Sequence, residues 1–166
     1  MKTAELLGKL PIAIGAIVVA SLFVFLRFAQ TLPTVMQDEY VYMVQTYLQP
    51  ASANEFGNFL HSFVYSFVFL FDDFYLATKL LNSLFLIVFA LAVLLLARKF
   101  LDHWLATLVS VGTVLSATSL YASVLMPEMM FFALASCEVV FFVFAIESVD
   151  DKRYYFLGLS VFALSL

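Results

Sequence analysis

The chain has 166 residues, of which 64 % are hydrophobic and 12 % are charged, and its mean hydropathy is +1.04. Soluble domains are about half apolar and carry roughly 25 % charged residues, so this composition argues against a water-soluble fold. The net charge of −4 argues against nucleic-acid binding, which needs a basic surface. We therefore expect an all-α fold, a polytopic membrane helix bundle.

The first predicted span covers 9–30. A transmembrane helix needs about 20 mostly apolar residues, and the apolar stretch from Leu10 to Leu26 comes close to this length. It is longer than the apolar core of a signal peptide, and it continues into Arg27 without a small-residue cleavage site. The pattern predicts an uncleaved first membrane helix.

A long connection, 31–75, follows this span. Apolar residues in Gln37–Leu48 recur at helical spacing, and Pro50 ends the pattern. A second apolar piece, 59–71, is too short for a confident span. We expect two amphipathic helices at the outer membrane surface.

Four further apolar segments complete the predicted bundle. The last one reaches the end of the sequence after about 13 residues, too few to cross a bilayer at 1.5 Å per residue. We therefore expect the chain to be a fragment, or the ordered part of something larger; the family resemblance given below implies an N-terminal module. The predicted segments are 76–97, 104–124, 128–147 and 154–166.

The basic residues predict the orientation of the bundle. With the N-terminus inside, six Lys and Arg residues lie in inner segments and two lie on the outer side. Cytoplasmic segments carry such an excess, so the N-terminus is predicted to be cytoplasmic. The inner residues are Lys2, Lys9, Arg98, Lys99, Lys152 and Arg153, and the outer ones are Arg27 and Lys79.

Three of the acidic residues predicted on the outer side open helices. Asp38 and Glu39 open the Gln37–Leu48 helix, and Glu128 opens the fourth span. Carboxylates in a first helical turn can simply cap free N–H groups and complement the helix dipole. Alternatively, a carboxylate held at the membrane surface can act as a general base on an acceptor hydroxyl. Both interpretations stay open at this point.

Glu138 is predicted to lie near the middle of the bilayer, about 15 Å below Glu128 at 1.5 Å per residue. A charge at that depth costs roughly 2.5–3.5 kcal/mol, so Glu138 should face the bundle interior, pair with a polar group or stay protonated. This residue supports an alternative function, a transporter or channel subunit. The candidate partners in the third predicted span are Ser110, Thr113, Ser116 and Thr118.

Asp72, Asp73 and Lys79 lie near the predicted outer end of the second span. The two aspartates are typical of a solvated interfacial turn. Lys79 is at snorkelling distance from that interface, where it can meet a lipid phosphate or pair with one of the aspartates. The single cysteine, Cys137, cannot form an internal disulfide, and His61 and His103 are too far apart in sequence to indicate a metal site.

The order of these features resembles the GT-C superfamily of membrane glycosyltransferases, in particular the branch of protein mannosyltransferases and lipid A aminoarabinose transferases. One span is followed by an outer loop that opens with Asp38-Glu39-Tyr40-Val41-Tyr42. The segment from Phe74 to Ser83 is similar to the start of the family's second span, with Lys79 where many relatives have Arg. The segment from Leu120 to Glu128 resembles the turn between its third and fourth spans.

The resemblance implies transfer of a sugar from a polyprenyl-phosphate donor to a lipid, glycan or protein acceptor on the extracytoplasmic side, with inversion. Asp38 would be the catalytic base, supported by Glu39. Glu128, Lys79 and Tyr42 would bind substrate, with Lys79 at the lipid phosphate. Some relatives use a divalent cation, so metal dependence stays open. The implied location is a prokaryotic plasma membrane.

Two alternatives remain from the residues themselves. One is the transporter or channel subunit built around Glu138. The other is a non-catalytic membrane partner subunit, suggested by the short chain, whose bundle would be completed by helices of the same or another chain.

Overall fold

A computed structural model describes residues 2–31, 37–48, 59–147, 152–153 and 155–159, with side chains omitted at 2–9, 37–39, 45, 48 and 59. The described residues form helices and contain no strand. The α-helices are α1 (Lys2–Ala29), α2 (Gln37–Leu48), α3 (Phe59–Ser66), α4 (Phe74–Ala97), α5 (His103–Leu115) and α6 (Glu128–Glu147), and the 3-10 helices are η1 (Phe67–Leu70) and η2 (Ala117–Ser123).

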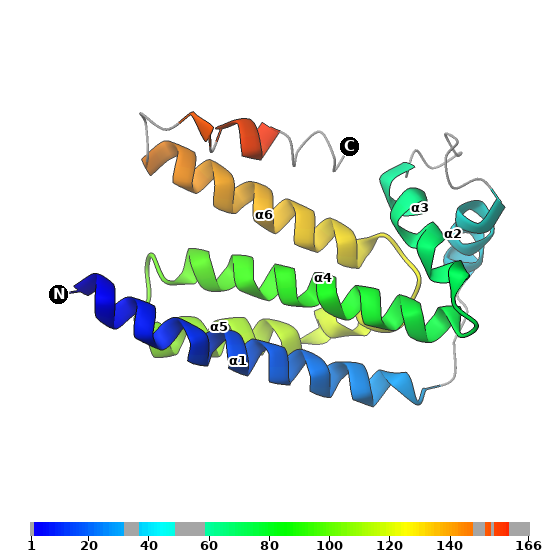
Figure 1. Cartoon of the computed structure of the whole chain (residues 1–166), viewed down its shortest axis with the longest axis horizontal. Coiled ribbons are helices and arrows are strands. Elements are labelled where there is room, and N and C mark those ends of the chain that lie inside the picture. The colour runs from blue at the N-terminus through cyan, green and yellow to red at the C-terminus, as the bar shows by residue number, and fades with distance from the viewer. Residues whose placement is uncertain (1, 32–36, 49–58, 148–151, 154, 160–166) are drawn as a thin grey trace.

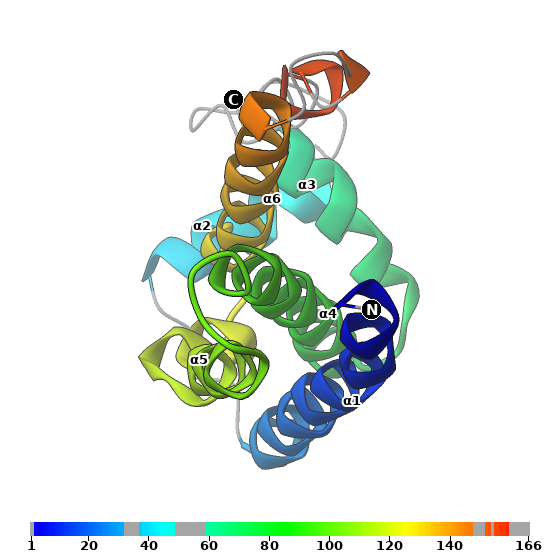
Figure 2. The same ribbon diagram turned by 90° about the vertical axis from the view of Figure 1, so that its left-hand side faces the viewer.

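Helix α4 is the centre of the bundle and packs against α1, α5 and α6 (Figure 1, Figure 2). Among the residues that the structure describes, three helical segments are long and apolar enough to cross a membrane: Leu10–Ala29, Phe74–Ala97 and Glu128–Glu147. A fourth is added if α5 and η2 count as one bent span. The described part of the chain is thus helical, and the chain is an integral membrane protein, as its composition predicts.

The third predicted span, 104–124, is not one straight helix. Helix α5 ends at Leu115, and η2 continues at an angle of 47° to it. Ser116 has an extended backbone, its hydroxyl donates to the carbonyl of Thr113, and its oxygen accepts from the N–H of Thr118. Such local side-chain bonds offer the backbone an alternative to regular α-helix, which explains the break.

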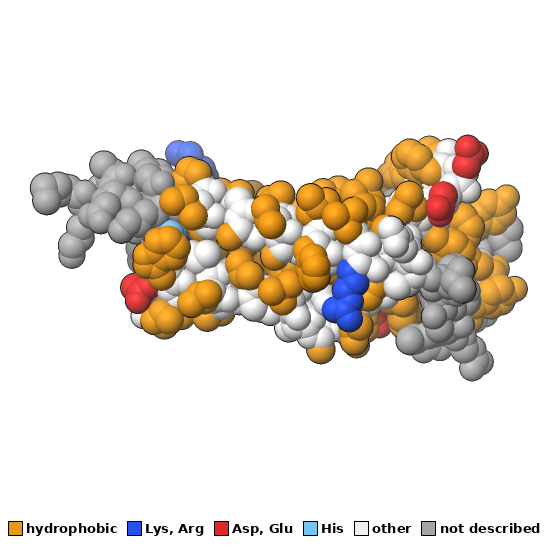
Figure 3. All heavy atoms as spheres, turned by 90° about the horizontal axis from the view of Figure 1, so that it is seen from below, with side chains coloured by type: hydrophobic (Ala, Val, Ile, Leu, Met, Phe, Trp, Pro, Cys, Tyr) orange, Lys and Arg blue, Asp and Glu red, His pale blue; other side chains and the backbone are white. Residues whose placement is uncertain are grey.

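Small residues let α1 and α4 approach each other. Residues 13, 17, 20 and 24 of α1 are buried at helical spacing, and 86, 90 and 94 of α4 are buried in the same core. Three of these seven residues are alanines, and small side chains at an interface allow close van der Waals packing, which drives helix association in a bilayer. The remaining apolar side chains spread along the outside of the bundle, where lipid can cover them (Figure 3).

Helices α2 and α3 lie together at the end of the bundle where α1 ends and where α4 and α6 begin (Figure 1). A second core cluster joins the α3–η1 segment to the bundle. Tyr65 and Val68 contribute from this segment, and Leu125 and Met130 contribute from the bundle. The bounds of α2 agree with the helix predicted over 37–48. Helix α3 and η1 together cover nearly all of the second apolar piece, predicted over 59–71. That they lie on a membrane surface stays a prediction.

The opposite end of the bundle is held by polar contacts. The carboxylate of Asp102 caps α5 by accepting from the N–H groups of Trp104 and Leu105. Lys99, just after α4, forms an ion pair with Glu147, the last residue of α6, and its ammonium lies 4.2 Å from the Phe144 ring centroid. Of the predicted fifth segment, 154–166, the structure describes a helical stretch at 155–159, and the rest lies outside the described residues.

Candidate functional site

The helices that carry the predicted acids meet at one end of the bundle. Asp38 and Glu39 lie in the first turn of α2, and Glu128 is the first residue of α6. The structure therefore brings the three backbones to the same end, as the topology predicts (Figure 1). The side chains of Asp38 and Glu39 lie outside the described part of the structure, so their distance to Glu128 and their catalytic role stay predictions.

A row of aromatic rings leads from α2 into the bundle. The ring of Tyr42 meets the edge of the His61 ring, with 5.5 Å between centroids. His61 in turn lies 4.4 Å from Tyr65, measured between ring centroids, at an interplanar angle of 32°. Tyr42 is predicted to contact substrate, and its ring lies beside His61. Nothing in the sequence pattern predicts this contact.

Tyr65 ends this row in a buried hydrogen-bond network. Its hydroxyl donates to Oδ1 of Asn82 in α4. The amide nitrogen of Asn82 donates to the carbonyl of Val124 at 2.6 Å and to that of Tyr121 at 3.3 Å. Because Asn82 is 0 % exposed, this one side chain links α3, α4 and the chain leading into α6 without help from solvent.

Two polar groups near this network have no hydrogen-bond partner among the described residues. One is His61, which is 1 % exposed and has both ring nitrogens unpaired. The other is Oε2 of Glu128, which is also buried. Buried polar atoms are nearly always satisfied in folded proteins, so unpaired ones mark places where water or a ligand can bind.

Burial also sets the protonation states here. It lowers the pKa of His61 from 6.5 to about 4, so the imidazole is neutral at physiological pH. Burial raises the pKa of Tyr65, and the negative charge of the nearby Glu128 raises it further. Tyr65 is therefore a hydroxyl donor to Asn82 and never a phenolate in the pH range of a cell.

Lys79 has a structural role at the junction of α1 and α4. Its ammonium donates to the carbonyls of Phe28 and Thr31, both at 2.9 Å, and the residue is 4 % exposed. Phe28 lies in the last turn of α1, where the helix dipole is negative and a cation is favourable, and its carbonyl also accepts from the N–H and the hydroxyl of Thr31. Among the described residues Lys79 makes this contact in place of the predicted pairing with Asp72 or Asp73. Its predicted contact with a lipid phosphate is untested.

A hollow of 520 Å³ lies between α2 and the start of α4. Tyr40 and Tyr47 line it from α2, and Phe69 and Phe74 line it from the facing segments, together with Met43 and Val44. Tyr47 and Phe69 meet edge to face with 5.3 Å between centroids. An apolar, aromatic-walled hollow of this size is suited to an apolar chain or to the face of a sugar ring.

Glu138 lies in α6 and is half-buried. Helix α6 packs on α4 and η2. Of the hydroxyls predicted as partners of Glu138, those of Ser110, Thr113 and Ser116 donate to carbonyls of their own helix region, and that of Thr118 accepts from Ser116. Within the described residues none of them bonds to Glu138. The transporter hypothesis has no added support from these contacts.

The described residues contain no group of three or more His, Cys, Asp or Glu side chains that could hold a metal ion. The sequence could have pointed to His61 and Asn82, because each is a polar residue inside an apolar run. Nothing in the sequence indicated that they share Tyr65 as a neighbour.

Comparison with known proteins finds no protein-family model, no curated protein and no solved structure that matches the chain. The resemblance to GT-C glycosyltransferases stays a prediction.

Proposed function

We propose that the chain is the N-terminal membrane module of a GT-C-like glycosyltransferase. The observation that carries the proposal is the position of α2. This helix opens with Asp38 and Glu39, its aromatic side lines the 520 Å³ hollow, and it lies at the same end of the bundle as Glu128. A helix that opens with two acids and lines an apolar hollow at a bundle end is suited to a donor that combines a lipid chain with a sugar.

In the proposed reaction an acceptor hydroxyl attacks the anomeric carbon of a polyprenyl-phosphate sugar. The new glycosidic C–O bond forms as the bond from that carbon to the phosphate oxygen breaks, which inverts the configuration. Asp38 takes the hydroxyl proton as general base, and polyprenyl phosphate leaves with the bonding electrons. Glu39 supports Asp38, Glu128 shapes the substrate site, and Tyr42 contacts the substrate.

The proposed orientation places this end of the bundle outside the cell membrane. Lys99 and the preceding Arg98 follow α4 at the other end, and Arg27 and Lys79 are the basic residues near the α2 end. Of the latter two, Lys79 is bonded to backbone carbonyls. The proposed site is thus extracytoplasmic, and the N-terminus is cytoplasmic.

The experiment uses the full chain in proteoliposomes with two radiolabelled donors, polyprenyl-phosphate mannose and polyprenyl-phosphate aminoarabinose. Sugar transfer to lipid and protein fractions and donor binding are both measured. Asp38→Asn should reduce transfer by about 10²–10⁴-fold, the usual contribution of a general base, and should leave donor binding and thermal stability intact. Asn caps a helix about as well as Asp, so a capping role predicts almost no change.

Asp102→Asn is the matched control, because Asp102 caps α5 at the opposite end. It should transfer sugar like the wild type. Near-normal transfer in Asp38→Asn, or neither binding nor transfer of either donor by the wild type, would refute the assignment.

A further inference from the structure

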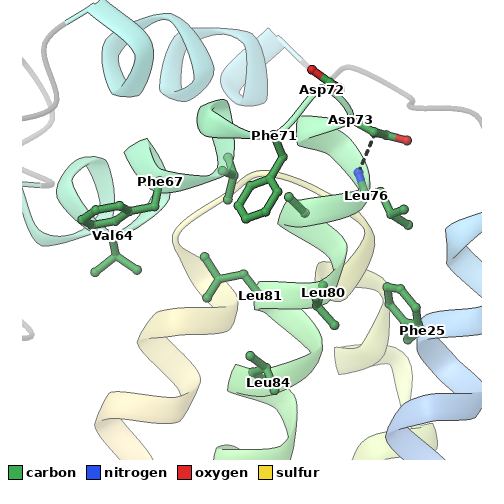
Figure 4. A pocket seen from close by; sticks show the side chains of 12 residues that line it. Phe25, Val64, Phe67, Phe71, Asp72, Asp73, Leu76, Leu80, Leu81 and Leu84 are labelled. Carbon is green, nitrogen blue, oxygen red and sulfur yellow. Dashed lines mark hydrogen bonds between the residues drawn. The ribbon is translucent and has the colours of Figure 1, made fainter.

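A second, larger hollow opens on the membrane-facing side of the bundle. It has a volume of 610 Å³ and lies between α1, the α3–η1 segment and α4 (Figure 4). Leu76, Leu80 and Leu84 form its floor at four-residue spacing along one side of α4. Phe25 stands on one side and Phe67 and Phe71 on the other. We call it the α4 groove.

The α4 groove is polar at one end only. Asp72 and Asp73 lie at its mouth, and every other lining residue is apolar. Asp73 caps α4 by accepting from the N–H of Leu76 at 2.9 Å, whereas Asp72 is exposed and has no partner among the described residues. The groove therefore offers a free carboxylate at its mouth and hydrocarbon below it.

The length of the groove fits one membrane leaflet. From Asp73 to Leu84 a helix rises about 16 Å at 1.5 Å per residue. Half of the bilayer's hydrocarbon core is about 15 Å thick. With the start of α4 at the interface, the groove runs from headgroup depth to the middle of the membrane, which is the path of one acyl chain.

We propose that the α4 groove binds a phospholipid with a primary ammonium headgroup, of the phosphatidylethanolamine class. The acyl chain lies along Leu76, Leu80 and Leu84, and the ammonium pairs with Asp72 and Asp73. The two carboxylates repel an anionic headgroup. Lys79, the basic side chain of α4, does not offset this repulsion, because it is buried and bonded to backbone carbonyls. A quaternary ammonium cannot donate hydrogen bonds to a carboxylate, so phosphatidylcholine should bind more weakly.

This inference does not depend on sugar transfer. The α4 groove and the 520 Å³ hollow beside α2 share no lining residue. The glycosyltransferase proposal can fail while this one stands, and the reverse also holds.

The first experiment identifies the occupant of the groove. The photoreactive residue p-benzoylphenylalanine replaces Phe67, an aromatic residue in the wall of the groove, in the full chain, which is reconstituted into nanodiscs with equal amounts of phosphatidylethanolamine, phosphatidylcholine and phosphatidylglycerol. Irradiation should add the mass of phosphatidylethanolamine to the protein. A cross-link to another polypeptide segment would overturn the proposal, because it would show that a helix covers the groove.

The second experiment tests the headgroup by native mass spectrometry of the protein released from the same nanodiscs. The wild type should retain phosphatidylethanolamine about fivefold over either other lipid, the upper end for an exposed ion pair. Asp72→Asn with Asp73→Asn should bring that ratio to about one and leave the fold intact, because Asn still caps α4. Equal retention of all three lipids by the wild type, or an unchanged preference in the double variant, would overturn the proposal.

The third variant blocks the apolar part of the groove. Leu80→Trp should remove most of the retained lipid, because the indole fills the floor. Leu108→Trp is the matched control, since Leu108 is also an exposed leucine, on α5, and does not line the groove. Equal lipid loss in both variants, or in neither, would contradict the proposed position of the acyl chain.

Discussion

Tyr65 in α3 donates a hydrogen bond to Asn82 in α4, and the amide of Asn82 donates to backbone carbonyls in the segment that leads into α6. A helix outside the predicted spans is thereby fixed to two helices of the bundle through one buried amide. In lipid such bonds hold helices together, because an unpaired polar group there has no water to bind.

Removing either partner of the Tyr65–Asn82 hydrogen bond should loosen the packing of α3 against the bundle. Tyr65→Phe leaves Oδ1 of Asn82 without a donor and should cost about 1–2 kcal/mol of stability. Asn82→Ala should cost more, because the carbonyls of Tyr121 and Val124 also lose their donor. Thermal unfolding in detergent is measured for the wild type, the two single variants and the double variant. This double-mutant cycle should give a coupling energy of about 1 kcal/mol. Additive effects would argue against the bond, and Tyr121→Phe is the control for loss of a hydroxyl.

His61 should make the stability of the chain depend on pH. The pKa of His61 is about 4 in the folded protein and 6.5 in the unfolded chain, so the unfolded state binds more protons between these values. Stability should therefore fall as the pH is lowered from about 6.5 to about 4, by at most about 3 kcal/mol. His61→Leu should flatten this dependence. Melting temperatures measured from pH 4 to pH 7.5 test it, and parallel curves for both proteins would contradict it.

Lys79 should contribute to stability through its two carbonyl bonds. Lys79→Met keeps the length of the side chain, removes the ammonium and should cost about 1.5–3 kcal/mol, the range for hydrogen bonds to a charged group. The melting temperature should fall, and Lys152→Met, at an exposed position, should change it little. If Lys79 also binds a lipid phosphate, donor binding should weaken in Lys79→Met at temperatures where the protein is still folded. An unchanged melting temperature would show that the carbonyl bonds are unimportant.

Glu138 should be neutral or unfavourable for stability. It is half-buried in α6 and bonds to none of the hydroxyls predicted as its partners. A carboxyl group near mid-membrane opposes insertion by roughly 2.5–3.5 kcal/mol, so Glu138→Leu should keep or raise the melting temperature. A marked fall would show that the carboxyl has a partner in the folded protein. Sugar transfer should persist in this variant, whereas a transporter built around Glu138 would lose its activity.

The helical bounds were largely predictable, because they depend on local patterns. Apolar spacing and Pro50 defined the range of α2, and Met126-Pro127-Glu128 marked the start of α6. The bend at Ser116 was missed, because composition alone favours a continuous apolar helix over 104–124. The bonds of Ser116 to the neighbouring backbone outweigh that preference locally.

The site was harder to predict than the helices. Asp38, Glu39 and Glu128 could be assigned to one end of the bundle, because the number and direction of the spans determine it. The contacts of His61, Tyr65 and Asn82 depend on how α3 packs against α4, and sequence spacing holds no information on that packing. The role of Lys79 was missed for the same reason, since its partners lie 48 and 51 residues earlier.

The bend at Ser116 has a consequence for how this chain can change in evolution. Because η2 departs from regular α-helix, the carbonyls of Tyr121 and Val124 are free to accept from Asn82. Replacing Ser116 by a strong helix former would draw those carbonyls into a longer helix and leave the Asn82 amide without acceptors. Replacing Asn82 by leucine would leave the carbonyls without a donor. Ser116 and Asn82 should therefore be inherited as a pair.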